Sequence, residues 1–162
     1  MTRAAILAAV LLASVGATAG HAAPGTSMCT ASQLSAGSFR AVPGSAGAGN
    51  IVYALELRNT SSTTCTITGL PQGKLLDRAG KAQPTHIVPA FRGALTAVLV
   101  HLAPGKSTRA TARFSPDVSP CQATSYAFRV TLPGGTTTVT LKPATPVCEH
   151  GQLQFSAYGL PT

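Results

Sequence analysis

Acidic side chains are scarce in this chain, which has four Asp and Glu residues against 12 Lys and Arg in a length of 162. They are Glu56, Asp77, Asp117 and Glu149. Enzymes that hydrolyse glycosidic bonds commonly place two carboxyl groups on either side of a cleft. Asp77 and Asp117 instead occupy sequences typical of turns, where Asp bonds its own backbone. The shortage of carboxylates therefore disfavours glycoside hydrolysis.

Other signatures of catalysis and metal binding are missing as well. The chain has no Gly-x-Ser-x-Gly elbow to expose a nucleophilic serine. It has no Cys-x-x-Cys motif of the kind found in thioredoxin-like proteins and zinc knuckles. The densest group of potential metal ligands is Cys148-Glu149-His150, and a cysteine held in a disulfide cannot act as a ligand. We therefore expect a non-enzymatic protein without cofactor or metal. The alternative is a periplasmic hydrolase or metal-carrying protein.

Long apolar runs are missing after the first two dozen residues. Arg3 precedes an apolar run over residues 4–17, and small residues follow at the positions that a signal peptidase reads. This pattern is typical of a secretory signal peptide. The run is too short to cross a hydrocarbon core of about 30 Å comfortably, so we expect no transmembrane segment. Cleavage is expected after Ala22, with Ala19 as the alternative.

The expected signal peptide determines how the rest of the chain is divided. Residues 1–22 form the signal peptide, residues 23–28 a short exposed lead-in, and residues 29–162 a single domain. Cys29 follows Thr-Ser-Met, a poor match to a lipid-attachment site, so no lipid anchor is expected. The location is then the periplasm or the extracellular space, which the sequence does not separate.

Four cysteines follow the signal peptide, and an even number in an exported chain indicates disulfides. Four cysteines allow three pairings. We expect the two local ones, Cys29–Cys65 and Cys121–Cys148, each closing a loop worth about 3 to 4 kcal/mol in the chain-entropy model.

Apolar and polar residues alternate in several segments, as in half-buried strands of an antiparallel sheet. In one of them the alternation places Tyr126 inward together with Phe128. Residues 94–102 are apolar on both faces, which is typical of a more central strand. No segment after the signal peptide has a sustained helical period. The alternating segments are residues 51–58, 107–114, 126–132, 137–142 and 152–156.

Turn sequences separate these strands. Pro104-Gly105 fits a type II turn, Pro133-Gly134-Gly135 fits a hairpin, and residues 77–80 form another expected turn. Short strands at this spacing favour a β-sandwich or barrel. We expect a polar turn over residues 59–63, then a strand over residues 65–68 with Cys65 and Ile67 inward and the threonines outward.

The same residues carry a family resemblance. Asn59-Thr60-Ser61 precedes Cys65-Thr66-Ile67-Thr68-Gly69-Leu70-Pro71, and Leu102-Ala103-Pro104-Gly105, Cys121 and Cys148 follow in order. In these pieces the chain resembles the bacterial secreted family known as domain of unknown function 4232, over most of residues 29–158. The resemblance implies an exported, immunoglobulin-like sandwich. Together with the strand pattern and the cysteines, it leads us to expect an all-β, immunoglobulin-like antiparallel sandwich of about seven to nine strands, stapled by two disulfides. It implies no catalytic residues.

Positive charge is the remaining signal, since the formal net charge is +8. Arg109, Arg113, Arg129 and Lys142 occupy outward positions of three expected strands. If these strands are neighbours, the four cations form one face that would attract anionic envelope glycans or acidic lipid surfaces. Nucleic acid is the least expected partner, because Phe114, Tyr126 and Phe128 are assigned to the opposite face. The alternative is a solvated basic surface. We expect a monomer.

Overall fold

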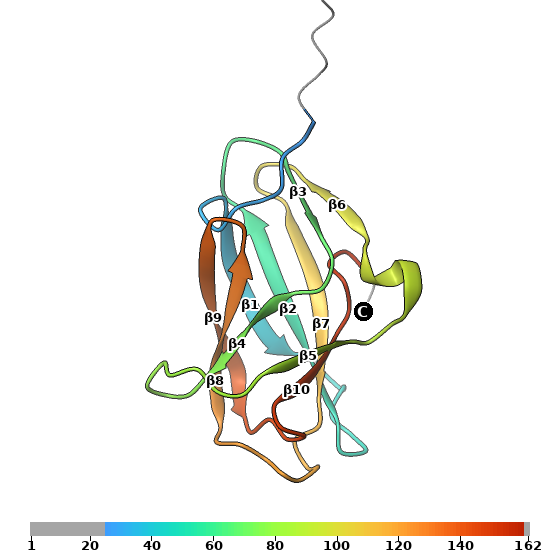
Figure 1. The fold of residues 1–162 in the computed structure, drawn as a ribbon, viewed down its shortest axis with the longest axis vertical. Helices are drawn as coiled ribbons and strands as arrows, with labels where there is room; N and C mark the ends of the chain where they lie inside the picture. The colour runs from blue at the N-terminus through green and yellow to red at the C-terminus, as the bar shows by residue number, and fades with distance from the viewer. Residues whose placement is uncertain (1–24, 161–162) are drawn as a thin grey trace, which may run out of the picture.

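The structure is a computed structural model that describes residues 25–160 (Figure 1), so the expected signal peptide lies outside the described residues. The all-β class is confirmed, with ten strands rather than seven to nine and one 3-10 helix, Gly93–Thr96. No helix in residues 25–160 is long and apolar enough to cross a membrane. The strands are β1 (Leu34–Ala41), β2 (Ile51–Asn59), β3 (Cys65–Thr68), β4 (Gln72–Leu76), β5 (His86–Pro89), β6 (Leu99–Leu102), β7 (Ser107–Phe114), β8 (Ser125–Leu132), β9 (Gly135–Thr145) and β10 (Gln152–Phe155).

Eight strands form one sheet in the order β4-β8-β9-β1-β2-β7-β10-β5, and β3 and β6 form a second sheet of two strands. Neighbours are antiparallel except for β1–β9 and β10–β5. In Figure 1, β4 and β5, the two edge strands of the large sheet, pass in front of β1 and β2. The Phe39 ring of β1 lies 5.6 Å from that of Phe128 and 6.1 Å from that of Phe155. The large sheet therefore curls around one core, as in a sandwich or a partly open barrel.

Alternation determines which side chains enter this core. In β2 the side chains of Tyr53, Leu55 and Leu57 are buried, and in β7 every second residue from Thr108 to Phe114 is buried. The Tyr53 and Phe114 rings, on these neighbouring strands, stack at 4.6 Å on the core side of the sheet. Outward positions of the same strands carry the polar and charged residues, so the expected faces of these strands are confirmed.

The prediction of a central strand over residues 94–102 is wrong. Part of this segment is the 3-10 helix, where the Thr96 hydroxyl donates to the Gly93 carbonyl at 2.8 Å. Only residues 99–102 form a strand, β6, which pairs with β3 and leaves Leu99 57% exposed. The segment is apolar on both faces, but its neighbour is a strand of four residues at one end of the core, and this cover is too small to bury both faces.

The inward placement of Tyr126 is also wrong. The β8–β9 register shifts between Ser125 and Ala127, which reverses the direction of the side chains on the N-terminal side of the shift. Ser125 is buried and its hydroxyl donates to the Gln83 side-chain oxygen at 3.1 Å, whereas Tyr126 is exposed. A bulge of this kind cannot be recognised from the alternation alone.

The expected turns are present. The Lys106 amide donates to the Ala103 carbonyl at 3.0 Å and Gly105 has a φ of 74°, as a type II turn requires. This turn joins β6 to β7, which belong to different sheets. Pro133 and Gly134 form the two-residue loop of the β8–β9 hairpin, in which Leu132 faces Gly135.

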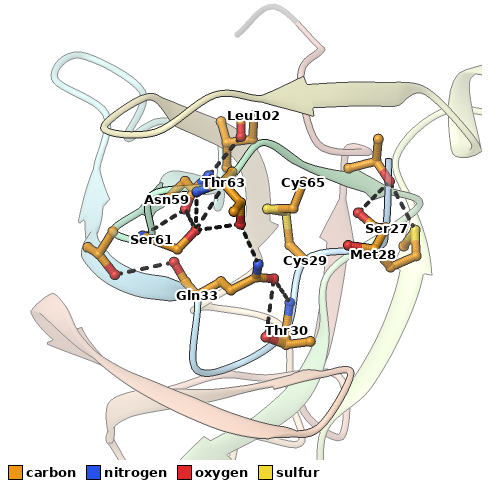
Figure 2. The surroundings of a disulfide bond; sticks show 12 residues. Ser27, Met28, Cys29, Thr30, Gln33, Asn59, Ser61, Thr63, Cys65 and Leu102 are labelled. Carbon is orange, nitrogen blue, oxygen red and sulfur yellow. Dashed lines mark hydrogen bonds between the residues drawn. A yellow bond between two sulfur atoms is a disulfide. The ribbon is translucent and has the colours of Figure 1, made fainter. Parts of the chain in front are cut away.

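Both expected disulfides are confirmed, Cys29–Cys65 and Cys121–Cys148. Figure 2 shows the first of them beside β3, where residues 27–29 run along the strand and bond to Thr66. Thr66 is therefore buried, although an outward position was expected for it. Ser27 and Met28, at the end of the expected lead-in, are exposed as predicted but also pair with β3.

Asn59 organises the same corner (Figure 2). Its side-chain amide donates to the carbonyls of Thr63 and Leu102, both at 2.8 Å, and its oxygen accepts from the Ser61 amide and hydroxyl. The side chain is completely buried. The Asn-x-Ser piece of the family motif is thus a structural element that connects β2, the turn and β6.

Candidate anion-binding site

The four predicted cations all lie on strands, but β7 is not next to β8 and β9, which are neighbours. Arg109 and Arg113 on β7 and Lys142 on β9 are exposed, and Arg129 on β8 is half-buried. β1 and β2 lie between β9 and β7 in the large sheet. The four cations were expected to form one face if their three strands were neighbours, and this arrangement is not found.

Two arginines that the sequence analysis did not select fill the gap. Arg40 on β1 pairs with Lys142 on β9 and with Ala54 on β2. Arg58 at the end of β2 pairs with Ser107 on β7. Both are exposed. The basic face is defined here as Arg40, Arg58, Arg109, Arg113 and Lys142, on the four hydrogen-bonded strands β9-β1-β2-β7.

One carboxylate lies among these cations. Glu56 on β2 pairs with Arg109 on β7, and their charged groups are 3.8 Å apart. Both side chains are partly exposed, at 32% and 55%, so this ion pair contributes little to stability. It is the only ion pair within 4.0 Å in residues 25–160. The side chains of the other four cations of the basic face are exposed, and none of them has a carboxylate partner within residues 25–160.

The sequence contained a signal for one of the two missed residues. Arg58 continues the outward series of the predicted strand 51–58. Arg40 lies in β1, which was not predicted because the alternation breaks at Gly37, where the register with β2 shifts between Ala36 and Ser38. Buried Leu34 and Phe39 are consequently five positions apart, which hides the period of two.

A groove of about 180 Å³ opens where β1 and β9 separate. The two strands pair only through Phe39 with Leu141 and Arg40 with Lys142. Beyond these pairs the strands diverge, and the groove lies between residues 36–40 and 138–142. Its polar lining includes the side chains of Ser38, Thr138 and Thr140, with Arg40 and Lys142 at one end.

Arg129 belongs to a second basic cluster, defined here as Lys74, Arg78, Lys81 and Arg129. Lys74 on β4 faces Arg129 on β8 in the antiparallel register. The Arg129 guanidinium donates to the Gly80 carbonyl at 3.4 Å, in the turn between β4 and β5 that also carries Arg78 and Lys81. β8 is separated from β1 by β9, so this cluster lies beside the basic face and not within it.

The candidate catalytic and metal-binding groups have local partners. Asp77 accepts from the amides of Ala79 and Lys81, both at 2.9 Å, which confirms its expected turn role. Cys148 is in a disulfide, and Glu149 accepts from the Gln152 side chain at 3.2 Å. Within residues 25–160, no three His, Cys, Asp or Glu side chains lie close enough to hold a metal ion together.

The comparison with family models agrees with the resemblance in the sequence. The family described as a domain of unknown function, DUF4232, matches residues 29–159. No curated protein and no solved structure is significantly similar to the chain. Because the match covers most of the chain, including all ten strands and both disulfides, this protein belongs to the DUF4232 family.

Proposed function

We propose that this protein is an exported, non-enzymatic binding module that attaches to anionic glycans or lipid surfaces of the cell envelope through its basic face. The observation that carries the proposal is the placement of five cations and one carboxylate on outward positions of four hydrogen-bonded strands. Alternation holds all five side chains on the same side of the sheet, opposite the core.

The physical character of the face suits extended polyanions. Exposed cations attract a polyanion over a Debye length of about 10 Å at 0.1 M salt, and each contact releases counterions. Each contact is weak, so several must act together, as a polymer or a charged surface allows. Two disulfides support a location outside the cytoplasm, where such bonds persist.

Retention of the protein, from residue 23 onward, on immobilised polyanion tests this proposal. We expect retention on a polyuronate matrix and on vesicles containing an acidic lipid at 20 mM salt, and release by 300 mM salt. Matched neutral polysaccharide and zwitterionic vesicles should not retain the protein at either concentration. Failure to bind either anionic material at low salt would overturn the proposed function.

A further inference from the structure

The groove between β1 and β9 has a different character from the rest of the basic face. Here two parallel neighbours separate and leave a recess of about 180 Å³ that has two cations at one end, whereas the recess of about 260 Å³ beside Arg113 has that single cation in its lining. Strand divergence exposes backbone polar groups that would otherwise bond across the sheet. The recess therefore offers fixed hydrogen-bonding groups next to cations.

One end of the groove is cationic. Arg40 and Lys142 face each other in the parallel register, so their backbones are about 5 Å apart, the spacing of neighbouring strands. Neither cation has a carboxylate within 4.0 Å in the described part of the chain. Two uncompensated cations on adjacent strands can bind one carboxylate, sulfate or phosphate group together, and the Arg guanidinium can do so with two parallel hydrogen bonds.

The other end of the groove is uncharged or acidic. Ser38, Thr138 and Thr140 contribute hydroxyl groups that can each donate and accept hydrogen bonds. Glu56 is not part of the lining but lies at the rim of this end, because a Cβ atom added to the lining residue Gly37 would be 3.5 Å from the Glu56 carboxyl carbon. A carboxylate accepts hydrogen bonds from ligand hydroxyl groups, and it repels a second negative charge at this end. The groove thus favours a ligand with one anionic end and one hydroxyl-rich end.

We propose that this groove binds a single acidic sugar unit of an anionic glycan, with the acidic group on Arg40 and Lys142 and ring hydroxyls on Ser38, Thr138, Thr140 and Glu56. A closed cavity of about 150 Å³ holds benzene, so this open groove of about 180 Å³ can take the six-membered ring of one sugar while the ring's substituents extend beyond it. The lining in residues 25–160 includes no exposed aromatic ring, so binding rests on charge and hydrogen bonds. This inference rests on the proposed function and names the sugar unit that the face selects.

Titration with a short uronic acid oligosaccharide tests the groove, followed by NMR shifts or calorimetry at 20 mM salt. The carboxyl-reduced oligosaccharide, inorganic phosphate and vesicles with an acidic lipid serve as alternative probes. We expect binding of the uronic acid oligosaccharide, at least tenfold weaker binding of phosphate, and no binding of the reduced form. Equal affinity for phosphate and the oligosaccharide would overturn the inference, because it would show a simple anion site.

Two pairs of variants test whether binding depends on the groove or only on the overall positive charge. Thr138→Val with Thr140→Val removes hydroxyls at constant charge, and Thr136→Val is the control, exposed on β9 outside the groove. Arg40→Gln is matched by Arg78→Gln, which removes the same charge from an exposed side chain of the second basic cluster. We expect the double Thr variant and Arg40→Gln each to weaken oligosaccharide binding at least fivefold and the controls less than twofold. If long polyanions bind but each variant behaves like its control, the groove inference fails and the basic face stands. If nothing anionic binds, both fail.

Discussion

Asn59 shows how one buried side chain can hold a corner of this fold. Its amide is the hydrogen-bond donor to two carbonyl groups, those of Thr63 and Leu102. We predict that Asn59→Ala lowers the free energy of unfolding by about 2 to 4 kcal/mol, because the buried bond to the Leu102 carbonyl and the partly buried bond to the Thr63 carbonyl are both lost. Urea denaturation measures this, with Asn50→Ala in an exposed loop bond as the control, expected to cost under about 1 kcal/mol. Equal effects of the two substitutions would contradict the structural role of Asn59.

For Tyr158 we predict the opposite result, that removing a buried polar group does not lower the free energy of unfolding. Its ring is buried, and its hydroxyl has no hydrogen-bond partner within residues 25–160. Removing an unpartnered buried hydroxyl costs nothing or is favourable, so Tyr158→Phe should leave stability at pH 8 unchanged or raised. By contrast, the Tyr53 hydroxyl donates to the Pro143 carbonyl at 2.8 Å, and Tyr53→Phe should cost about 1 kcal/mol.

The pH dependence of stability provides the second readout for Tyr158. Burial raises the pKa of Tyr158 above its ordinary value of 10.0. The unfolded tyrosine ionises near pH 10 while the folded one stays neutral, so this stabilisation is present below pH 10 and is lost as the pH rises further. The wild type should lose about 1.4 kcal/mol more than Tyr158→Phe between pH 8 and pH 11. Parallel curves for the two proteins in urea denaturation would show that the buried hydroxyl does not govern this loss.

At the scale of elements, β4 depends on Gly73. A Cβ atom at this position would collide with the Arg129 carbonyl oxygen and the Phe128 ring, both on the neighbouring β8. Backbone and a core ring cannot give way cheaply, so Gly73→Ala should destabilise the protein by about 3 kcal/mol or more. Gly47→Ala is the matched control, since a Cβ there meets nothing within 4 Å. Thermal denaturation of both variants should separate them clearly; a Gly73 variant as stable as the control would mean that β4 does not approach β8 so closely.

The strands also show which parts of the fold could be predicted from the sequence. β2 and β7 were predictable because their alternation runs unbroken against a single core. β1 was not predicted and Tyr126 was misplaced, because a register shift in each strand reverses the alternation. The disulfide pairing followed from loop locality. The candidate site was half predictable: outward directions came from the pattern, but the order of strands that brings Lys142 beside Arg40 comes from long-range pairing, which local sequence does not encode.

At the scale of the whole molecule, the cations form two groups that lie on different parts of the fold. The basic face extends across four strands, whereas the second basic cluster lies on β4, β8 and the turn between β4 and β5. Net charge alone attracts a polyanion to both groups equally. A face adapted to an extended polymer should instead bind through its continuous strand surface, so the two groups should differ although each variant removes the same charge.

The most direct measurement compares two triple variants of equal charge on a polyuronate matrix at 20 mM salt. One carries Arg40→Gln, Arg58→Gln and Arg113→Gln in the basic face, and the other carries Lys74→Gln, Arg78→Gln and Lys81→Gln in the second basic cluster. All six side chains are exposed, so each substitution should change stability by less than about 0.5 kcal/mol. We predict that the basic-face variant elutes without retention, while the cluster variant elutes close to the wild type. Equal loss of retention in the two variants would contradict a specific face and leave only the attraction of a positive net charge.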